Sequence, residues 1–116
     1  MQKSLDSPAL YGYIIAIMEY KIILSPRAVD NLNRMSTYNK AMVKDLIEVH
    51  LRHEPMKESK SRIKILRGIS HPQYRLRVND WRVFYDVYKN TVEILAIFSK
   101  QEAIEWLKQR EQEEIK

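Results

Sequence analysis

The chain contains no cysteine, and this absence excludes several classes of protein at once. Disulfide scaffolds, zinc ribbons and thiol nucleophiles all depend on cysteine side chains. A chain without cysteine fits a reducing compartment, so we expect a cytoplasmic protein. Histidine is also scarce, with His50, His53 and His71 as the three in the chain. The first two can share a helical face, but a metal site would need a third ligand that the spacing does not supply. We therefore expect no metal and no other cofactor.

Long apolar runs are missing as well. The apolar run at residues 13–18 is far shorter than the roughly 20 residues that a membrane-spanning helix needs, so we expect no membrane association. One lysine and an early Asp6 match a signal peptide poorly. The sequence also has no glycine-rich phosphate loop, no internal repeat and no low-complexity tract. Residues 1–17 are predicted to be an N-terminal extension, either native or produced by an upstream start codon, and residues 18–116 to be the folded domain.

The composition that remains suits one small domain. The chain has 116 residues, and its 45% of hydrophobic residues is enough for a core. Its net charge of +5 is unevenly spread, because residues 52–82 hold nine Lys and Arg and three Asp and Glu. A basic block beside a near-neutral body is typical of a protein that binds a polyanion, and a solvated basic face is the alternative.

The first half of the chain predicts one strand followed by two helices. Residues 20–24 are β-rich and predict the strand. Ser25 and Pro26 suit the N-cap and the first position of a helix, and apolar residues at helical spacing follow them. Ser36 can cap a second helix that extends to about Arg52, so the two helices should pack as a hairpin.

The second half predicts strands and a final helix. The strands are expected at residues 64–68, 74–78, 81–88 and 92–98, where β-rich segments are bounded by turn residues. Ser99 and Glu102 form a capping box that starts a C-terminal helix, which we expect to fray beyond Gln109. The apolar residues of this helix are Ala103, Ile104, Trp106 and Leu107.

The order of these elements predicts an α+β domain with helices on one face of an antiparallel β-sheet. In this arrangement the N-terminal strand and the helical hairpin pack on the sheet, and the C-terminal helix follows the last strand.

The strand pair at residues 74–78 and 81–88 carries a cluster of arginines. Arg75 and Arg77 alternate with apolar residues, and a tight turn at Asn79-Asp80 can put Arg82 on their face. Folding alone does not reward such a cluster, whereas guanidinium groups match phosphate oxygens in pairs. Other side chains can contribute: Lys60 and Lys64 by adding charge, Phe84 and Tyr88 by stacking on bases, and Asp86 and Glu93 by neutralising part of the charge.

Several segments occur in a familiar order, namely YKIILSPRA, a helical hairpin, ILRG, YRLRVNDWRVFYDV and VEILAIFSK. In this order they resemble the RelE/ParE superfamily of toxins from type II toxin–antitoxin systems, over about residues 18–107. The most specific part is residues 74–87, with Tyr-Arg-Leu-Arg-Val, a short turn, an aromatic residue, Arg and Val-x-Tyr. This part is similar to the RelE-like branch, whose members bind the ribosomal A site and cleave mRNA. ParE-like members instead poison DNA gyrase.

The resemblance implies an endoribonuclease that needs no metal. The 2′-hydroxyl of the mRNA attacks the adjacent phosphate and gives a 2′,3′-cyclic phosphate and a free 5′-hydroxyl. The family's catalytic basic positions fall on three residues here. Arg82 would contact the phosphate in the transition state, while Arg75 and Arg77 would orient or activate the reacting groups. The expected RNA-binding residues are Lys60, Lys64, Arg67 and Lys100.

The sequence departs from the family pattern at two helper positions. Many RelE members have an arginine after the last strand and a tyrosine further along the final helix, where this chain has Gln101 and Leu107. Lys100 can replace the charge of that arginine but not its fork geometry. Among the other tyrosines, Tyr85 and Tyr88 are the candidates for the missing hydroxyl. The usual glycine before the hairpin aromatic is also replaced, by Asn79-Asp80.

Three functions therefore stay open for this sequence. The first is a ribosome-dependent mRNA endoribonuclease, and the second is a gyrase-poisoning or other non-nuclease toxin. The third is a degenerate module that only binds an antitoxin. The resemblance implies a cognate antitoxin as partner in all three, in a toxin–antitoxin hetero-oligomer, and the ribosome and mRNA as partners in the first. Trp106 and Ile104 are candidate antitoxin contacts, unless they pack back onto the sheet.

Overall fold

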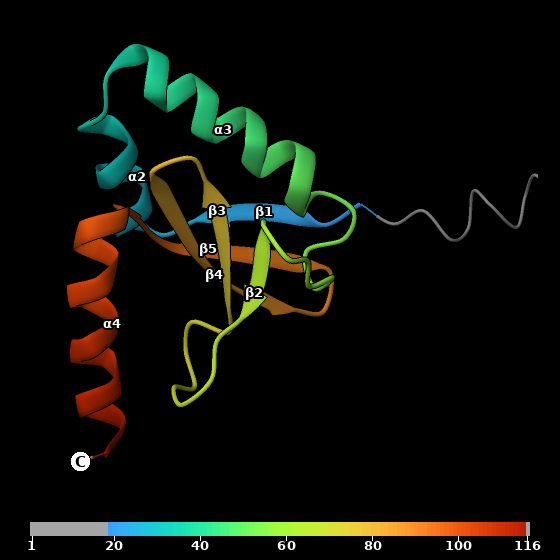
Figure 1. Cartoon of the computed structure of the whole chain (residues 1–116). Coiled ribbons are helices and arrows are strands. Elements are labelled where there is room, and N and C mark those ends of the chain that lie inside the picture. Colours follow the sequence, from blue (N-terminus) through green and yellow to red (C-terminus); the bar gives the residue numbers. More distant parts are fainter. Residues whose placement is uncertain (1–18, 116) are drawn as a thin grey trace, which may run out of the picture.

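The computed structural model describes residues 19–115, which form three helices around one five-stranded sheet (Figure 1). The predicted extension at residues 1–17 lies outside the described residues. The elements in chain order are β1 (Lys21–Leu24), α2 (Pro26–Asn33), α3 (Thr37–Leu51), β2 (Ile63–Ile65), β3 (Tyr74–Val78), β4 (Trp81–Tyr88), β5 (Thr91–Ser99) and α4 (Lys100–Ile115).

Serine caps fix the starts of the first two helices, as the sequence predicts. The Ser25 hydroxyl accepts from the Ala28 N–H at 3.1 Å and donates to the Leu95 carbonyl at 2.9 Å, so it also ties α2 to β5. The Ser36 hydroxyl accepts from the Asn39 N–H at 3.1 Å at the start of α3. Each cap satisfies a backbone donor that has no partner within the helix.

The sheet has the strand order β1-β5-β4-β3-β2. The α+β class is as predicted, but the sheet is mixed, because β1 pairs with β5 in parallel while every other pair is antiparallel. The cause is the long connection between them, since the chain passes through the helical hairpin and a three-strand meander before β5 returns beside β1. Parallel neighbours require such a crossover, which a short turn cannot supply.

The two faces of the sheet are covered by different helices (Figure 1). The larger core lies under α2 and α3, where Val43 and Ile47 pack with the sheet residues Leu76, Val83 and Ile97. A smaller core on the opposite face is formed under α4. Its buried members are Phe84, Ala96 and Ala103, with Phe98 and Trp106 packed against them. The expectation that all helices share one face is therefore wrong for α4.

The final helix is longer than the sequence predicts. Instead of fraying beyond Gln109, α4 continues to Ile115. Arg110 lies over the Trp106 ring at 5.3 Å and donates to the His71 carbonyl at 2.8 Å, and the Ser70 hydroxyl donates to Glu114 at 3.0 Å. These contacts to the β2–β3 loop hold the last turns. No helix within residues 19–115 is long and apolar enough to cross a membrane.

Candidate functional site

A tight hairpin between β3 and β4 sets the register of the arginines. Asn79 takes a positive φ of 53°, a conformation that asparagine tolerates better than most residues, so it replaces the expected glycine. The turn pairs Val78 with Trp81, and Arg77 directly with Arg82. Because neighbouring side chains alternate between faces, Arg75 and Arg77 share the face opposite the buried Leu76 and Val78. The predicted three-arginine face is present.

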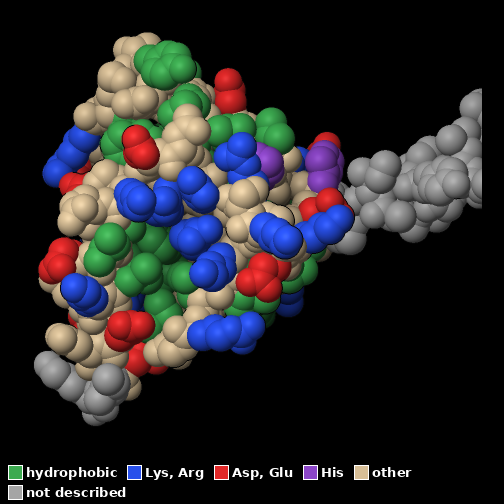
Figure 2. Space-filling view, viewed as in Figure 1, with side chains coloured by type: hydrophobic (Ala, Val, Ile, Leu, Met, Phe, Trp, Pro, Cys, Tyr) green, Lys and Arg blue, Asp and Glu red, His purple; other side chains and the backbone are tan. Residues whose placement is uncertain are grey.

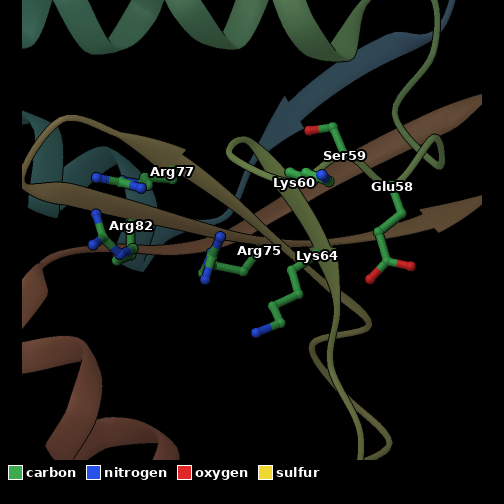
Figure 3. A pocket seen from close by; sticks show the side chains of 7 residues that line it. All are labelled: Glu58, Ser59, Lys60, Lys64, Arg75, Arg77 and Arg82. Atoms are coloured by element: carbon green, nitrogen blue, oxygen red, sulfur yellow. The ribbon is translucent and has the colours of Figure 1, made fainter.

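These arginines line a cleft of about 560 Å³ (Figure 3). Lys64 lies opposite Arg75 on the edge strand β2, and Lys60 comes from the loop before it. We call this the arginine cleft, and its lining residues are Glu58, Ser59, Lys60, Lys64, Arg75, Arg77 and Arg82. Two of the four predicted RNA-binding residues, Lys60 and Lys64, are therefore beside the arginines.

The other two predicted RNA-binding residues do not line the arginine cleft. Arg67 is exposed in the loop after β2. Lys100 is exposed at the start of α4, where its backbone N–H donates to the Asp80 carbonyl at 2.7 Å. Lys100 consequently lies beside the hairpin turn that precedes Arg82, whereas Arg67 is separate from the cleft.

The loop before β2 folds back along the edge of that strand. The Ser59 hydroxyl accepts from the N–H groups of Arg62 and Ile63 at 3.0 and 3.2 Å, and the Ser59 N–H donates to the Ile63 carbonyl at 2.9 Å. Glu58 accepts from the Ile65 N–H at 3.2 Å. These bonds hold the Glu58 carboxylate along the edge strand, at the end of the cleft opposite Arg77 and Arg82 (Figure 3). No sequence pattern points to Glu58, because a polar loop does not reveal which of its residues turns toward a cleft.

The Arg82 guanidinium is held by the hairpin itself. It donates to the carbonyls of Asn79 and Trp81 at 2.8 and 2.9 Å. Partial burial lowers the pKa of Arg82, and the positive charge of Arg77 lowers it further. Arg82 is thus a fixed donor whose charge would be better satisfied with an anion in the cleft.

Arg75 has an unsatisfied donor. Its Nε is buried and has no hydrogen-bond partner among the described residues. Burial lowers the pKa of Arg75, and the nearby charges of Arg82 and Arg77 add to that effect. A buried donor without a partner is costly, and the like charges of the three arginines add to that cost. An anion in the cleft would offset the charge repulsion.

Two expectations about the neighbours of the arginines are wrong. Asp86 does not neutralise them, because it pairs with His71 Nδ1 at 2.8 Å and accepts from the Gln73 N–H at 2.7 Å. Phe84 cannot stack on a base, because it is fully buried, with its ring 4.9 Å from that of Trp106. Tyr88 is 72% exposed, but it does not line the arginine cleft.

The remaining predicted residues are structural or outside the cleft. Leu107 packs against the smaller core, and Gln101 is exposed in the first turn of α4. The Tyr85 hydroxyl is buried and donates to the Pro55 carbonyl at 2.5 Å, so it serves the core. His50 and His53 both line a different cleft. Within the described part of the chain, no group of three or more His, Cys, Asp or Glu side chains could hold a metal ion.

The fold and the cleft define a small α+β protein with a basic cleft beside the edge strand of its sheet. The profile of one family, described as ParE toxin of type II toxin-antitoxin system, parDE, matches residues 22–104. The chain therefore belongs to this toxin family, within the RelE/ParE superfamily. A comparison with curated proteins finds no match.

Solved toxin structures share the fold. The toxin–antitoxin complex RelBE2 from Mycobacterium tuberculosis matches with 21% identity over 71% of this chain and 92% of that chain, at a TM-score of 0.60. The RelB-RelE complex from Methanococcus jannaschii matches with 19% identity over 72% and 96%, at 0.57. The YoeB-YefM complex from Staphylococcus aureus matches with 26% identity over 68% and 94%, at 0.50. The fold is thus that of RelE-type toxins.

Proposed function

We propose that this toxin is an endoribonuclease that cleaves mRNA on the ribosome, in the cytoplasm. The observation that carries the proposal is the arginine cleft, which is lined by five Lys and Arg side chains, Arg75 among them. The Nε of Arg75 is buried and has no partner among the described residues. Guanidinium groups in this arrangement suit the oxygens of a phosphodiester.

In the proposed reaction, the 2′-hydroxyl of one nucleotide attacks the adjacent phosphorus. The bond from the 2′-oxygen to phosphorus forms and the bond from phosphorus to the 5′-oxygen breaks, which leaves a 2′,3′-cyclic phosphate and a free 5′-hydroxyl. Arg82 and Arg77 stabilise the charge that develops on the non-bridging oxygens, and Arg75 orients the phosphate through its guanidinium group.

Two protons must move during this step. Glu58 is the carboxylate that lines the cleft, so we assign it to accept the proton of the attacking 2′-hydroxyl. The leaving 5′-oxygen gains a proton, and we assign this role to the ammonium groups of Lys60 and Lys64, which line the cleft. Neither role requires the arginine and tyrosine that the family pattern has at Gln101 and Leu107.

Replacing Arg82 with alanine tests the proposal. Expression of the wild-type chain should arrest growth and produce codon-phased cuts in mRNA, as read by primer extension. Arg82→Ala should lose both effects while it stays folded and still binds an antitoxin. A variant that stays fully toxic would show that the arginine cleft is not the working site.

A gyrase poison is the second candidate, because the matched family is the ParE toxin family and the two helper residues are absent. Intact message together with DNA damage after induction would favour this function. Accumulation of the wild-type protein without growth arrest would instead favour a module that only binds antitoxin.

We also propose that the chain works with a cognate antitoxin in a hetero-oligomer. Several proteins of this fold have been solved as toxin–antitoxin complexes. Of the two predicted antitoxin contacts, Ile104 is 45% exposed and available, whereas Trp106 packs against the sheet.

A further inference from the structure

Two more clefts adjoin the arginine cleft around the edge strand β2. One, of about 220 Å³, is lined by Ser61, Arg62, Arg77 and Asn79. It shares Arg77 with the arginine cleft. The other, of about 470 Å³, lies at the end of α3, and it shares Ser61 and Arg62 with the small cleft. The three clefts are therefore adjacent, and we call them together the edge track.

The edge track carries the net charge of the whole molecule. It is lined by seven basic side chains, Lys57, Lys60, Arg62, Lys64, Arg75, Arg77 and Arg82, and by two acidic ones, Glu54 and Glu58. Its balance of +5 equals the net charge of the chain, so the acidic and basic residues elsewhere cancel. Figure 2 shows Lys and Arg side chains gathered across the middle of this face, with histidine side chains at one end.

We propose that the edge track binds the backbone of a single RNA strand beyond the reacting nucleotide, with Lys57 and Arg62 as phosphate contacts. The proposal rests on the proposed function, because the strand is the continuation of the RNA that occupies the arginine cleft. Its two new cationic residues lie outside the arginine cleft and have no assigned role in cleavage.

The geometry at the junction supports this path. The Arg62 guanidinium donates to the Arg77 carbonyl at 3.2 Å, which holds its charge between the arginine cleft and the cleft at the end of α3. In that last cleft, partial burial lowers the pKa of His50 and the charge of Arg62 lowers it further, which favours the neutral imidazole. A neutral imidazole suits stacking or hydrogen bonding to a base, while Lys57 contacts phosphate. A flexible single strand can follow a track that turns around a sheet edge, whereas a rigid duplex cannot.

Lys57 is the residue to test, because its side chain is 72% exposed and its ion pair with Glu54 is long, at 3.9 Å. Lys108 gives a matched control on α4, with a side chain 66% exposed and a similar i,i+3 pair to Glu105 at 3.8 Å. Neither substitution should affect folding. Arg62 suits the test less well, because its guanidinium also holds the Arg77 carbonyl.

The experiment measures binding of the full chain to 2′-O-methylated RNAs of 4 and 12 nucleotides, which cannot be cleaved, over a series of salt concentrations. The 12-nucleotide RNA should bind more tightly than the short one. Lys57→Gln should weaken binding of the long RNA by roughly 3- to 10-fold at low salt, and should reduce the slope of log affinity against log salt by about 0.7, the value for one phosphate of a single strand. Binding of the short RNA should change little, and Lys108→Gln should match the wild type with both.

Equal binding of the long RNA by Lys57→Gln and the wild type would contradict the proposal that the edge track binds RNA. So would equal losses with both RNA lengths, or a 12-residue polyglutamate that binds as tightly as RNA and depends equally on Lys57. Arg82→Ala separates the two proposals, because it should weaken binding of both RNAs. If Arg82→Ala has no effect on either RNA, the proposed use of the arginine cleft fails, whatever the result at Lys57.

Discussion

At the scale of single residues, the arginine cleft combines fixed and unsatisfied donors. Arg82 is anchored by two backbone carbonyls, while the buried Nε of Arg75 has no partner among the described residues. A cluster of like charges is unfavourable in the free protein. The pKa values of both arginines are lowered mainly by burial, and the neighbouring positive charges lower them further. A phosphate in the cleft would reduce this repulsion. The charge repulsion in the free protein therefore favours the binding of an anion over that of a neutral ligand.

Replacing Arg75 with lysine separates charge from geometry. Lysine keeps the positive charge but has no Nε–H and no planar fork. We expect Arg75→Lys to lower the rate of mRNA cleavage on ribosomes by roughly 100-fold, the low end of the range seen when one transition-state donor is lost. Arg67→Lys is the matched control, because Arg67 lies outside the arginine cleft, and its rate should equal that of the wild type. A fully active Arg75→Lys would mean that charge alone suffices at this position.

The proposed role of Glu58 as proton acceptor leads to a second prediction for a single residue. Glu58→Gln keeps an oxygen that can accept from the Ile65 N–H, so the loop should stay in place. The amide cannot accept the proton of the 2′-hydroxyl, and cleavage should fall by about 100-fold or more, while binding of a 2′-O-methylated RNA should not weaken. Glu105→Gln on α4 serves as control. If Glu58→Gln cleaves at the wild-type rate, the proton acceptor is another group.

At the scale of helices and strands, the sequence predicts a feature correctly where that feature depends on contacts between residues close together in the chain. The caps of Ser25 and Ser36, and the bounds of β3 and β4, follow from short patterns and are confirmed. The predicted strand at residues 64–68 is shorter and begins earlier, at Ile63–Ile65, because its length depends on pairing with β3. The three-arginine face could also be predicted from a local pattern. The alternation of side chains along β3 and the two-residue turn before β4 together determine which face the arginines share.

Contacts between distant segments could not be predicted in this way. The parallel pairing of β1 with β5 joins residues about 70 positions apart, and no local pattern encodes it. The sheet face that α4 covers depends on contacts with the buried Phe84. The alternation of side chains along β4 predicts only that Phe84 lies on the face opposite the larger core. Glu58 and Arg62 join the clefts only because the loop before β2 folds back on that strand.

The docking of α4 on the sheet leads to a prediction about stability. Trp106 lies between Phe84 and Phe98, with ring centroids 4.9 and 5.3 Å away. Because Trp106 is only partly buried, Trp106→Ala should cost about 2–3 kcal/mol of unfolding free energy, somewhat less than a fully buried aromatic residue. Ile104→Ala on the exposed side of α4 should cost under about 1 kcal/mol. Urea unfolding of both variants measures the difference, and equal costs would contradict the packing role of Trp106.

At the scale of the whole molecule, charge and core are separated in space. The net positive charge lies along the edge track, while the larger core holds Tyr85 as a buried group that can ionise. Burial raises the pKa of the Tyr85 hydroxyl far above its usual range, and the neighbouring Tyr74 contributes to the shift. The folded protein therefore keeps Tyr85 protonated in alkaline solution, where an unfolded chain would release the proton.

This difference predicts how stability depends on alkaline pH. An unfolded tyrosine ionises near pH 10 while folded Tyr85 does not, so the unfolded chain binds fewer protons above that pH and the free energy of unfolding falls as pH rises. Tyr85→Phe should lose about 1 kcal/mol at pH 7, because the hydrogen bond to the Pro55 carbonyl is removed. The same variant should show a weaker decline above pH 10 than the wild type. Tyr88→Phe is the matched control, because Tyr88 is largely exposed, and it should follow the wild-type curve in thermal unfolding from pH 7 to 11. Parallel curves for Tyr85→Phe and the wild type above pH 10 would show that Tyr85 does not govern the alkaline loss of stability.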